Sequence, residues 1–284
     1  MQRASAAMLP DGRRMHLHHG PIDLIVETFG GDQKAACRRA AARFETVLDE
    51  LVSELTELRC QADAGRRFRG AVAARMQKAI APFAREFITP MAAVAGAVAD
   101  EILGAMLDGG EFSKAYVNNG GDTAFHLTGA ETIRAAVAND HTAGITIDAG
   151  QPWRGVATSG WRGRSHSLGI ADSVSVVASD AARADAAATM IANRVDLPAN
   201  PKIERQPACA LSPDSDLGDR LVTTGVASLD ETEITEALDN GLRYADILVS
   251  KGLIGGAILI LDGQTRMTQA GQSLFHTEGE MTHA

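Results

Sequence analysis

The sequence is poor in aromatic residues and in cysteine, and its basic residues are outnumbered by acidic ones. Phe, Trp and Tyr together make up 4% of the 284 residues, whereas glycine occurs 28 times, which indicates small-residue packing and many tight turns. The three cysteines, Cys37, Cys60 and Cys209, are scattered and odd in number, so they provide neither a zinc-binding spacing nor a disulfide framework. A net charge of −9 argues against a general nucleic-acid surface, because phosphate binding needs clustered Lys and Arg.

Signals for export and for membrane insertion are also missing from the pattern. The opening segment, MQRASAAMLPDGRR, has no apolar core before its Pro and Asp, unlike a secretory signal. No apolar run approaches the roughly 18 residues that a membrane-spanning helix needs. Free thiols suit a reducing compartment. Together these absences predict a cytoplasmic protein without a membrane partner.

The residues that are present predict a mixture of helices and strands. Two short strands are expected within 13–29, followed by helices over about 32–59 and 69–87. Thr89 and Pro90 offer the N-cap and first position of an apolar helix, MAAVAGAVADEILGAML. Gly96 within it indicates close approach by another helix or by a ligand, and packing is the favoured reason. Because such a helix is apolar nearly all round, we expect it to be buried.

Beyond residue 110 the pattern changes to short strands. We expect strands near 114–118, 122–127, 132–138, 143–148, 154–158 and 172–178. A helix over about 180–193 with Ser179 as its N-cap, a long loop over 196–219, a strand near 220–228, a helix over 231–250 and a hairpin near 256–269 follow. Strands in runs, without strict alternation with helices, predict the α+β class. We expect one domain over residues 1–270 and a disordered polar tail over 271–284.

The stretch AYVNNGGDTAFHL, residues 115–127, places two glycines between two apolar runs. Asn-Gly between such runs is the usual signal of a β-hairpin. Glycine also lets other atoms come close to the main chain, so the same residues suit the floor of a ligand pocket. Both interpretations are open on these residues alone.

A second stretch, GVATSGWRGRSH, carries hydroxyl groups, a glycine and two arginines over residues 155–166. Hydroxyls and backbone N–H groups beside Arg162 and Arg164 make a cradle for phosphate, or else an ordinary polar loop with solvated arginines. A Ser-His hydrolase is disfavoured, because no G-x-S-x-G elbow surrounds Ser159.

A third stretch, ARADAAATMIAN, places Asp185 and Thr189 four residues apart on the predicted helix. At this spacing the two side chains lie on the same side, and the alanines between them leave space. A carboxylate and a hydroxyl are hard oxygen ligands that suit Mg²⁺, which often shares phosphate oxygens of a substrate. The alternative is a pair of ordinary surface side chains.

The order of these three motifs resembles the ApbE superfamily, whose named activity is FAD:protein FMN transfer. The resemblance rests on the N-G-G turn, the A-T-S-G strand end followed by a histidine, the A-D-x-x-x-T helix and the apolar helix before the turn. It extends over roughly residues 88–193 and is only general elsewhere. It implies an α+β fold with mixed or antiparallel sheets and helices around a central flavin cleft.

The resemblance also implies roles for individual residues. The glycine turn would line the cofactor, which nominates Asn119, Gly120, Gly121 and Asp122. The segment Thr158, Ser159 and Gly160 would lie in the same flavin pocket, while Asp185 and Thr189 would hold Mg²⁺ near the FAD pyrophosphate. Asp185 and His166 are the candidate catalytic residues. The implied cofactors are FAD and Mg²⁺.

One departure from the family pattern concerns the segment after the A-T-S-G strand. The family has an Asp-Pro and Thr-Gly loop there, but SHSLGIADSVSV contains neither. We therefore expect a divergent branch that either transfers FMN from FAD to a protein threonine or binds flavin without cleaving it. An enzyme on an unrelated small molecule that reuses the cleft is a further alternative. Expected partners are FAD or a related dinucleotide, an acceptor protein and, in a homodimer, a second copy of the chain.

Overall fold

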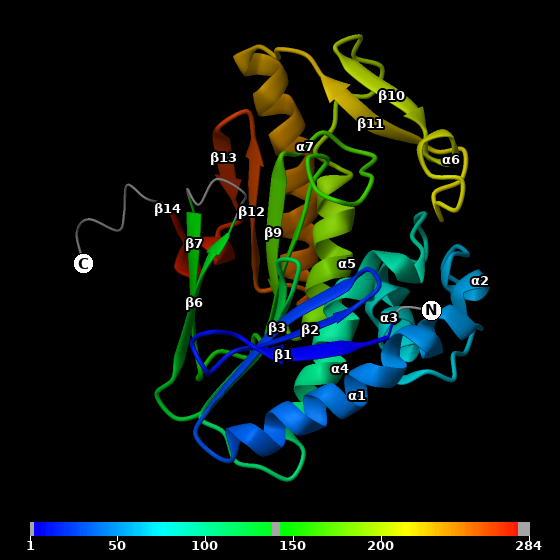
Figure 1. The fold of residues 1–284 in the computed structure, drawn as a ribbon. Coiled ribbons are helices and arrows are strands. Elements are labelled where there is room, and N and C mark those ends of the chain that lie inside the picture. Colours follow the sequence, from blue (N-terminus) through cyan, green and yellow to red (C-terminus); the bar gives the residue numbers. More distant parts are fainter. Residues whose placement is uncertain (1–2, 138–142, 278–284) are drawn as a thin grey trace. The chain divides into compact units, whose positions relative to one another are not determined.

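The computed structural model describes residues 3–137 and 143–277, which form an α+β fold of helices and antiparallel strands (Figure 1). The chain divides into two compact units. Unit 1 comprises Met1–Ile133, Ile147–Ala157 and Ser179–Asp185, and unit 2 comprises Arg134–Thr146, Thr158–Ala178 and Ala186–Ala284. We describe each unit by itself.

Most of the N-terminal half of the chain belongs to unit 1. Its strands are β1 (Ser5–Met8), β2 (Met15–His19), β3 (Ile22–Phe29), β4 (Lys114–Asn119) and β5 (Asp122–Leu127). Its helices are α1 (Gln33–Ser53), α2 (Leu55–Leu58), α3 (Ala71–Ile80), η1 (Ala81–Phe83), η2 (Pro90–Ala93) and α4 (Val94–Leu107). The strands pair antiparallel in the order of the chain, and β5 also pairs with the start of β8 (Gly155–Ser159).

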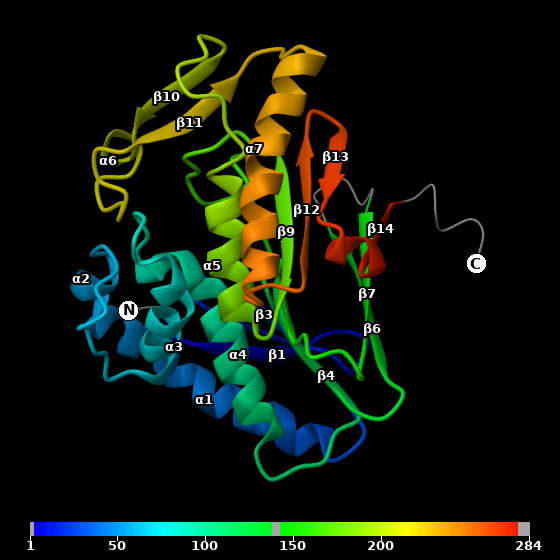
Figure 2. The same cartoon turned by 180° about the vertical axis from the view of Figure 1, so that it is seen from behind.

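Helix α1 covers this sheet because its apolar residues recur on one face. Ala36, Ala40, Phe44, Val47 and Leu51 are buried at spacings of three and four, and α1 contacts β2, β3 and α4. The side chain of Asp32 accepts a hydrogen bond from the Ala35 N–H and starts the helix, as capping chemistry predicts. Figure 2 shows α1 crossing α4, with α3 beside them.

Helix α4 is the most apolar element of unit 1. It contacts α1, α3, β4 and β5, and these contacts explain why nearly all of its residues are apolar. The expectation that no apolar run reaches the length of a membrane span is wrong: the 18 residues Pro90–Leu107 pass that test by length and composition, with a mean hydropathy of 1.4 and half of the segment buried. The helix also begins differently from the prediction, because Thr89 forms no side-chain cap and a 3₁₀ turn, η2, precedes α4.

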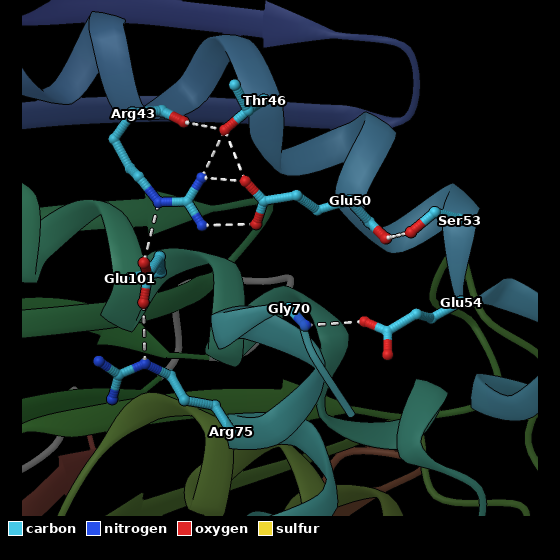
Figure 3. A network of polar contacts seen from close by, with 8 residues as sticks. All are labelled: Arg43, Thr46, Glu50, Ser53, Glu54, Gly70, Arg75 and Glu101. Carbon is cyan, nitrogen blue, oxygen red and sulfur yellow. Dashed lines mark hydrogen bonds and ion pairs between the residues drawn. The ribbon is translucent and has the colours of Figure 1, made fainter. Parts of the chain in front are cut away.

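A network of charged side chains joins α1, α3 and α4 (Figure 3). The Arg43 guanidinium donates from Nε to Glu101 Oε1 at 2.9 Å and from Nη2 to Glu50 Oε2 at 2.8 Å. Arg75 Nε reaches the other oxygen of Glu101 at 3.3 Å. Because Glu101 is only 15% exposed, solvent screens its ion pairs less than those of a fully exposed side chain.

Unit 2 holds an antiparallel sheet and a long helix. Its strands are β9 (Ser173–Ala178), β10 (Ile203–Pro207), β11 (Leu221–Val226), β12 (Gly256–Leu261), β13 (Gln264–Met267) and β14 (Phe275–Thr277), and its helices are α6 (Ala208–Leu211), α7 (Glu231–Ser250) and η3 (Ala270–Ser273). The strand order is β9-β12-β13, and β10 pairs with β11. Helix α7 runs along β12 (Figures 1 and 2) and begins at a capping box of Asp230 and Glu233.

Three elements, β6 (Thr132–Val137), β7 (Ala143–Asp148) and α5 (Ala181–Ala192), have residues in both units, as β8 does. Three local predictions are corrected. Asp180, not Ser179, accepts the hydrogen bond from the Arg183 N–H at the start of α5. The predicted loop over 196–219 contains β10 and α6. The expected disordered tail is structured through Thr277, where β14 pairs with β7. The remaining residues of the tail lie outside the described part of the chain. Residue 138, the last of the expected strand 132–138, also lies outside it.

Candidate functional site

The glycine stretch forms a two-residue β-hairpin between β4 and β5. Gly120 and Gly121 have φ values of 63° and 118°, in the region that glycine alone adopts readily. A Cβ at Gly121 would meet nothing within 4 Å, so the backbone angle and not crowding requires glycine there. Asn118 Oδ1 accepts from the Gly121 N–H at 3.4 Å and its amide donates to Thr123 Oγ1 at 2.8 Å. The hairpin prediction is therefore confirmed.

The base of this hairpin is attached to the first turn of α4. Asn119, which lies directly across from Asp122, is buried and donates from Nδ2 to the Ala95 carbonyl at 3.0 Å. The next residue of α4, Gly96, donates its N–H to Asp185 Oδ2 of α5 at 3.1 Å. Two motifs that are far apart in the sequence thus meet at consecutive residues of one helix.

Two glycines allow α5 to come this close. A Cβ at Gly96 would lie 2.2 Å from the Ala181 carbonyl oxygen, and a Cβ at Gly155 would lie 2.1 Å from the Asp180 carbonyl carbon. No side chain fits at either position, so the backbone of the first turn of α5 contacts the backbone of α4 and of β8 within unit 1. The prediction of a packing role for Gly96 is confirmed.

The carboxyl of Asp185 has an unusual environment. It is partly buried and accepts hydrogen bonds from the backbone N–H groups of Gly96 and Ala95. Burial, and then the neighbouring carboxyl of Asp122, raise the pKa of Asp185 well above its ordinary value. Asp122 itself is only 7% exposed. The arrangement puts two carboxyl groups side by side in a poorly solvated place.

A third carboxylate, Asp100, lies one turn further along α4. Its Oδ1 and Oδ2 accept from the backbone N–H groups of Ala181 and Ala182 at 3.0 and 2.9 Å, so it caps the beginning of α5. Burial raises the pKa of Asp100 to about 6, with a further contribution from nearby Asp180. Asp100 was not predicted from the sequence; the adjacent carboxylates Asp100 and Glu101 inside an otherwise apolar helix were the available signal.

The T-S-G segment, residues 158–160, belongs to unit 2. Thr158 Oγ1 lies 2.7 Å from Ser175 Oγ of β9, and both Thr158 and Ser159 are partly exposed at the end of β8. A Cβ at Gly160 would lie 2.4 Å from the Asp172 carbonyl oxygen, so this position also requires glycine. Trp161 follows and donates its N–H to the Ala171 carbonyl at 3.0 Å.

The loop over 161–171 is tied down at both ends. Arg162 Nε pairs with Asp172 Oδ1 at 2.5 Å, while the other oxygen of Asp172 accepts from the Asp262 N–H at 2.7 Å. Arg162, one of the two arginines of the predicted phosphate cradle, is therefore engaged in an ion pair. Arg164 and His166 lie in the middle of the loop and are exposed.

The far end of the loop is held by two residues that the sequence analysis did not single out. Asn193 Oδ1 accepts from the Leu168 N–H at 3.0 Å, and Thr223 Oγ1 donates to the Gly169 carbonyl at 2.8 Å. Asn193 ends the ARADAAATMIAN motif, and no periodicity distinguishes it from an ordinary helix end.

The predicted metal ligands fit the chemistry of a magnesium site. Asp185 and Thr189 lie one helical turn apart on α5 and supply a carboxylate and a hydroxyl. Within residues 3–137 and 143–277, no group of three or more His, Cys, Asp or Glu side chains could hold a metal ion. A cation at Asp185 therefore requires hydroxyl, backbone or ligand oxygens as well.

Comparisons with known proteins identify the family and the fold of the chain. A family model described as "AbpE bacteria" matches residues 6–267. The fold is similar to that of the Pseudomonas stutzeri flavinyl transferase ApbE in its apo form, with a TM-score of 0.52 and 13% identity over 96% of this chain and 98% of that one.

Relatives with higher identity match only part of the chain. The UPF0280 protein of Methanococcoides burtonii is 38% identical over 112 residues, which are 37% of this chain and 46% of that protein. The UPF0280 protein of Methanopyrus kandleri is 38% identical over 126 residues, 43% of this chain and 48% of its own length. The chain thus matches less than half the length of these relatives.

Proposed function

Since the chain belongs to the bacterial AbpE family, an ApbE-like branch, we propose that it binds FAD or a related flavin dinucleotide together with Mg²⁺. Transfer of FMN from FAD to a threonine of an acceptor protein is the reaction that such a site would support. One observation carries the proposal. Asn119 of the glycine hairpin and Asp185 of the A-D-x-x-x-T helix bond to Ala95 and Gly96, so two motifs that carry the resemblance are held at neighbouring residues of α4.

Each candidate residue has a role that its chemistry supports. The hairpin residues Asn119, Gly120, Gly121 and Asp122, together with Thr158, Ser159 and Gly160, would line the dinucleotide. Gly120 and Gly121 are exposed, and their bare backbone allows close approach. Asp185 and Thr189 would hold Mg²⁺, which when bound neutralises charge on the pyrophosphate.

The transfer would proceed by displacement at phosphorus. The acceptor threonine hydroxyl forms a bond to the FMN phosphorus, the pyrophosphate bond breaks, and AMP leaves. The role of the protein is to orient these groups and to stabilise charge, as in other phosphoryl transfers. His166 is the candidate for holding the hydroxyl proton, because it is an exposed imidazole on the loop that follows the T-S-G segment.

A second candidate function is flavin binding without transfer. It is favoured by the loop over 161–171, which lacks the Asp-Pro and Thr-Gly residues of the family. The pairing of Arg162 with Asp172 further favours it, because that guanidinium is already engaged. In this case the candidate residues retain the dinucleotide for redox chemistry or sensing.

Fluorescence titration with FAD tests the proposal. We compare the unaltered protein with Ser159→Leu, which adds a bulky side chain at a partly exposed strand end. The control is Ser5→Leu on the exposed strand β1. We expect saturable binding that Ser159→Leu weakens and Ser5→Leu leaves unchanged. Absence of FAD binding to the unaltered protein would refute the proposal. Release of AMP together with covalent attachment of FMN to the acceptor, on adding Mg²⁺ and acceptor, would distinguish the transferase from the binding module.

A further inference from the structure

Residues 64–85 carry a charge opposite to that of the whole chain. This segment has six basic residues and no acidic one, although the net charge of the chain is −9. It comprises the loop before α3, α3 itself and the beginning of the chain beyond η1, all within unit 1. We call its basic residues the basic surface: Arg66, Arg67, Arg69, Arg75, Lys78 and Arg85.

Two carboxylates beside the loop are used to hold its backbone. Glu54 accepts from the N–H groups of Arg69 and Gly70, each at 2.8 Å, and Figure 3 shows its bond to Gly70. Asp63 Oδ1 accepts from the Gly65 N–H at 2.8 Å. These bonds fix the course of the loop, so its shape does not depend on pairing between the carboxylates and the guanidinium groups.

The guanidinium groups of the loop form no ion pair with a carboxylate in the part of the chain that the structure describes. Arg66 donates to main-chain carbonyls, including that of Gln61 at 3.0 Å, and Arg67 donates to those of Ala64 and Arg66. Arg69 is exposed to solvent. The positive charge of the loop is therefore held in place but not neutralised.

Helix α3 extends the basic surface beside the loop. Gln77 Nε2 donates to the Asp63 carbonyl at 2.8 Å, which brings the helix and the loop together. Arg75 and Lys78 are exposed and lie three residues apart, on one side of the helix. Arg75 pairs with Glu101 at 3.3 Å (Figure 3), whereas Lys78 has no ion pair among the described residues.

We propose that the basic surface binds an acidic segment of a partner protein. Guanidinium groups form strong, directional hydrogen bonds with carboxylates, and arginine clusters are a recurring way of recognising acidic motifs. A short acidic segment places its charge only at this surface, and salt screens its repulsion from the acidic remainder of the chain. The inference goes beyond the proposed function and does not depend on it.

Two other anionic partners fit the surface less well. Binding at a membrane surface uses large apolar anchors as well as basic residues, and none of the exposed large apolar side chains of the described chain lies in residues 64–85. Single-stranded nucleic acid is bound by stacking on aromatic side chains, but Phe68 is half-buried and Phe83 is buried. A long polyanion would also extend beyond the surface and meet the acidic remainder of the chain.

The experiment measures the fluorescence anisotropy of labelled octaglutamate at low ionic strength, without flavin or Mg²⁺. It compares the unaltered protein with Arg67→Gln/Arg69→Gln and with Lys78→Gln. The control, Lys34→Gln/Arg38→Gln, removes two exposed charges from α1. We expect the loop variant to weaken binding about fivefold and Lys78→Gln about twofold, because each exposed charge pair contributes modestly. The control should bind like the unaltered protein.

Folding of each variant is checked by its unfolding temperature, and Lys78→Gln keeps the test decisive because its side chain forms no ion pair among the described residues. Weaker binding by both variants of the surface, with the control unchanged, supports the inference. Absence of octaglutamate binding by the unaltered protein overturns it, as does an equal affinity in all four proteins or an equal loss in the control.

The same titrations with octathymidylate and with phosphatidylserine vesicles test the choice of partner. We expect both to bind more weakly than octaglutamate. Tighter binding of either would assign the surface to nucleic acid or to a membrane and overturn the inference. Self-association of the unaltered protein that the loop variant abolishes would assign the surface to a second copy of the chain and would also overturn it.

Discussion

At the scale of single residues, the site depends on carboxylates placed where solvent is scarce. Asp100 and Asp185 both accept backbone N–H groups at the meeting of α4 and α5, and burial raises the pKa of each. Such groups cost folding free energy when they are charged, which natural chains tolerate chiefly where function requires it.

Asp100 gives a pH-dependent prediction. Its pKa of about 6 in the folded protein lies above its ordinary 3.8, so the folded state holds the proton more tightly and the contribution of this group to stability is lost as pH rises through 6. Asp100→Asn does not titrate. We expect the stability of the variant relative to the unaltered protein to increase between pH 4 and 7, by up to about 3 kcal/mol for a shift of about two units.

Urea unfolding at several pH values measures this difference. The exposed Asp49→Asn is the control and should show a much smaller dependence. A constant difference between Asp100→Asn and the unaltered protein across the range would mean that Asp100 titrates in the folded state as it does in the unfolded chain.

At the scale of secondary-structure elements, contact between α4 and α5 decides the geometry of the site. Gly96 and Gly104 lie on the same helix, but only Gly96 faces another backbone. Gly96→Ala should lower the free energy of unfolding by about 3 kcal/mol or more, because the added methyl overlaps Ala181. Gly104→Ala should raise it by about 0.5–1 kcal/mol, because alanine favours a helix and nothing lies within 4 Å. Equal effects in chemical denaturation would contradict the close contact.

The same elements indicate how far the sequence could predict the fold. Hairpins and long helices were predictable because glycine turns, capping residues and apolar periodicity are local signals, as at Gly120 and Asp230. Strand β10 could not be predicted, because its sequence IERQP does not alternate between apolar and polar residues. Its Arg205 instead forms an ion pair with Asp196, which lies outside the strand. The approach of Asn119 to Ala95 spans 24 residues and that of Asp185 to Gly96 spans 89, and no local pattern encodes such contacts.

At the scale of the whole molecule, the divergent loop and the overall charge bear on activity. The loop over 161–171 is held by its own contacts with Asp172, Asn193 and Thr223, and it lacks the family's Asp-Pro and Thr-Gly residues. A net charge of −9 disfavours acidic acceptor segments, with only Arg162 and Arg164 as local basic residues on that loop.

We therefore expect slow or absent flavin transfer to a typical acceptor of the family. Even a small misplacement of reacting groups can lower a rate about a hundredfold. The measurement is mass spectrometry of an acceptor incubated with the protein, FAD and Mg²⁺, with a known flavinyl transferase as the positive control. Rapid, stoichiometric addition of FMN would show that the family's loop is dispensable.

The most direct test of the central claim is the effect of Mg²⁺ on FAD binding in unaltered protein and in Asp185→Asn. This substitution keeps the shape of the side chain and removes its charge, and the N–H of Gly96 can still donate to the amide oxygen. Equilibrium titrations at zero and saturating Mg²⁺ give four dissociation constants. The account predicts that Mg²⁺ tightens FAD binding by the unaltered protein and has little effect on Asp185→Asn. An equal response to Mg²⁺ in both proteins would contradict it and leave Asp185 as an ordinary helix residue.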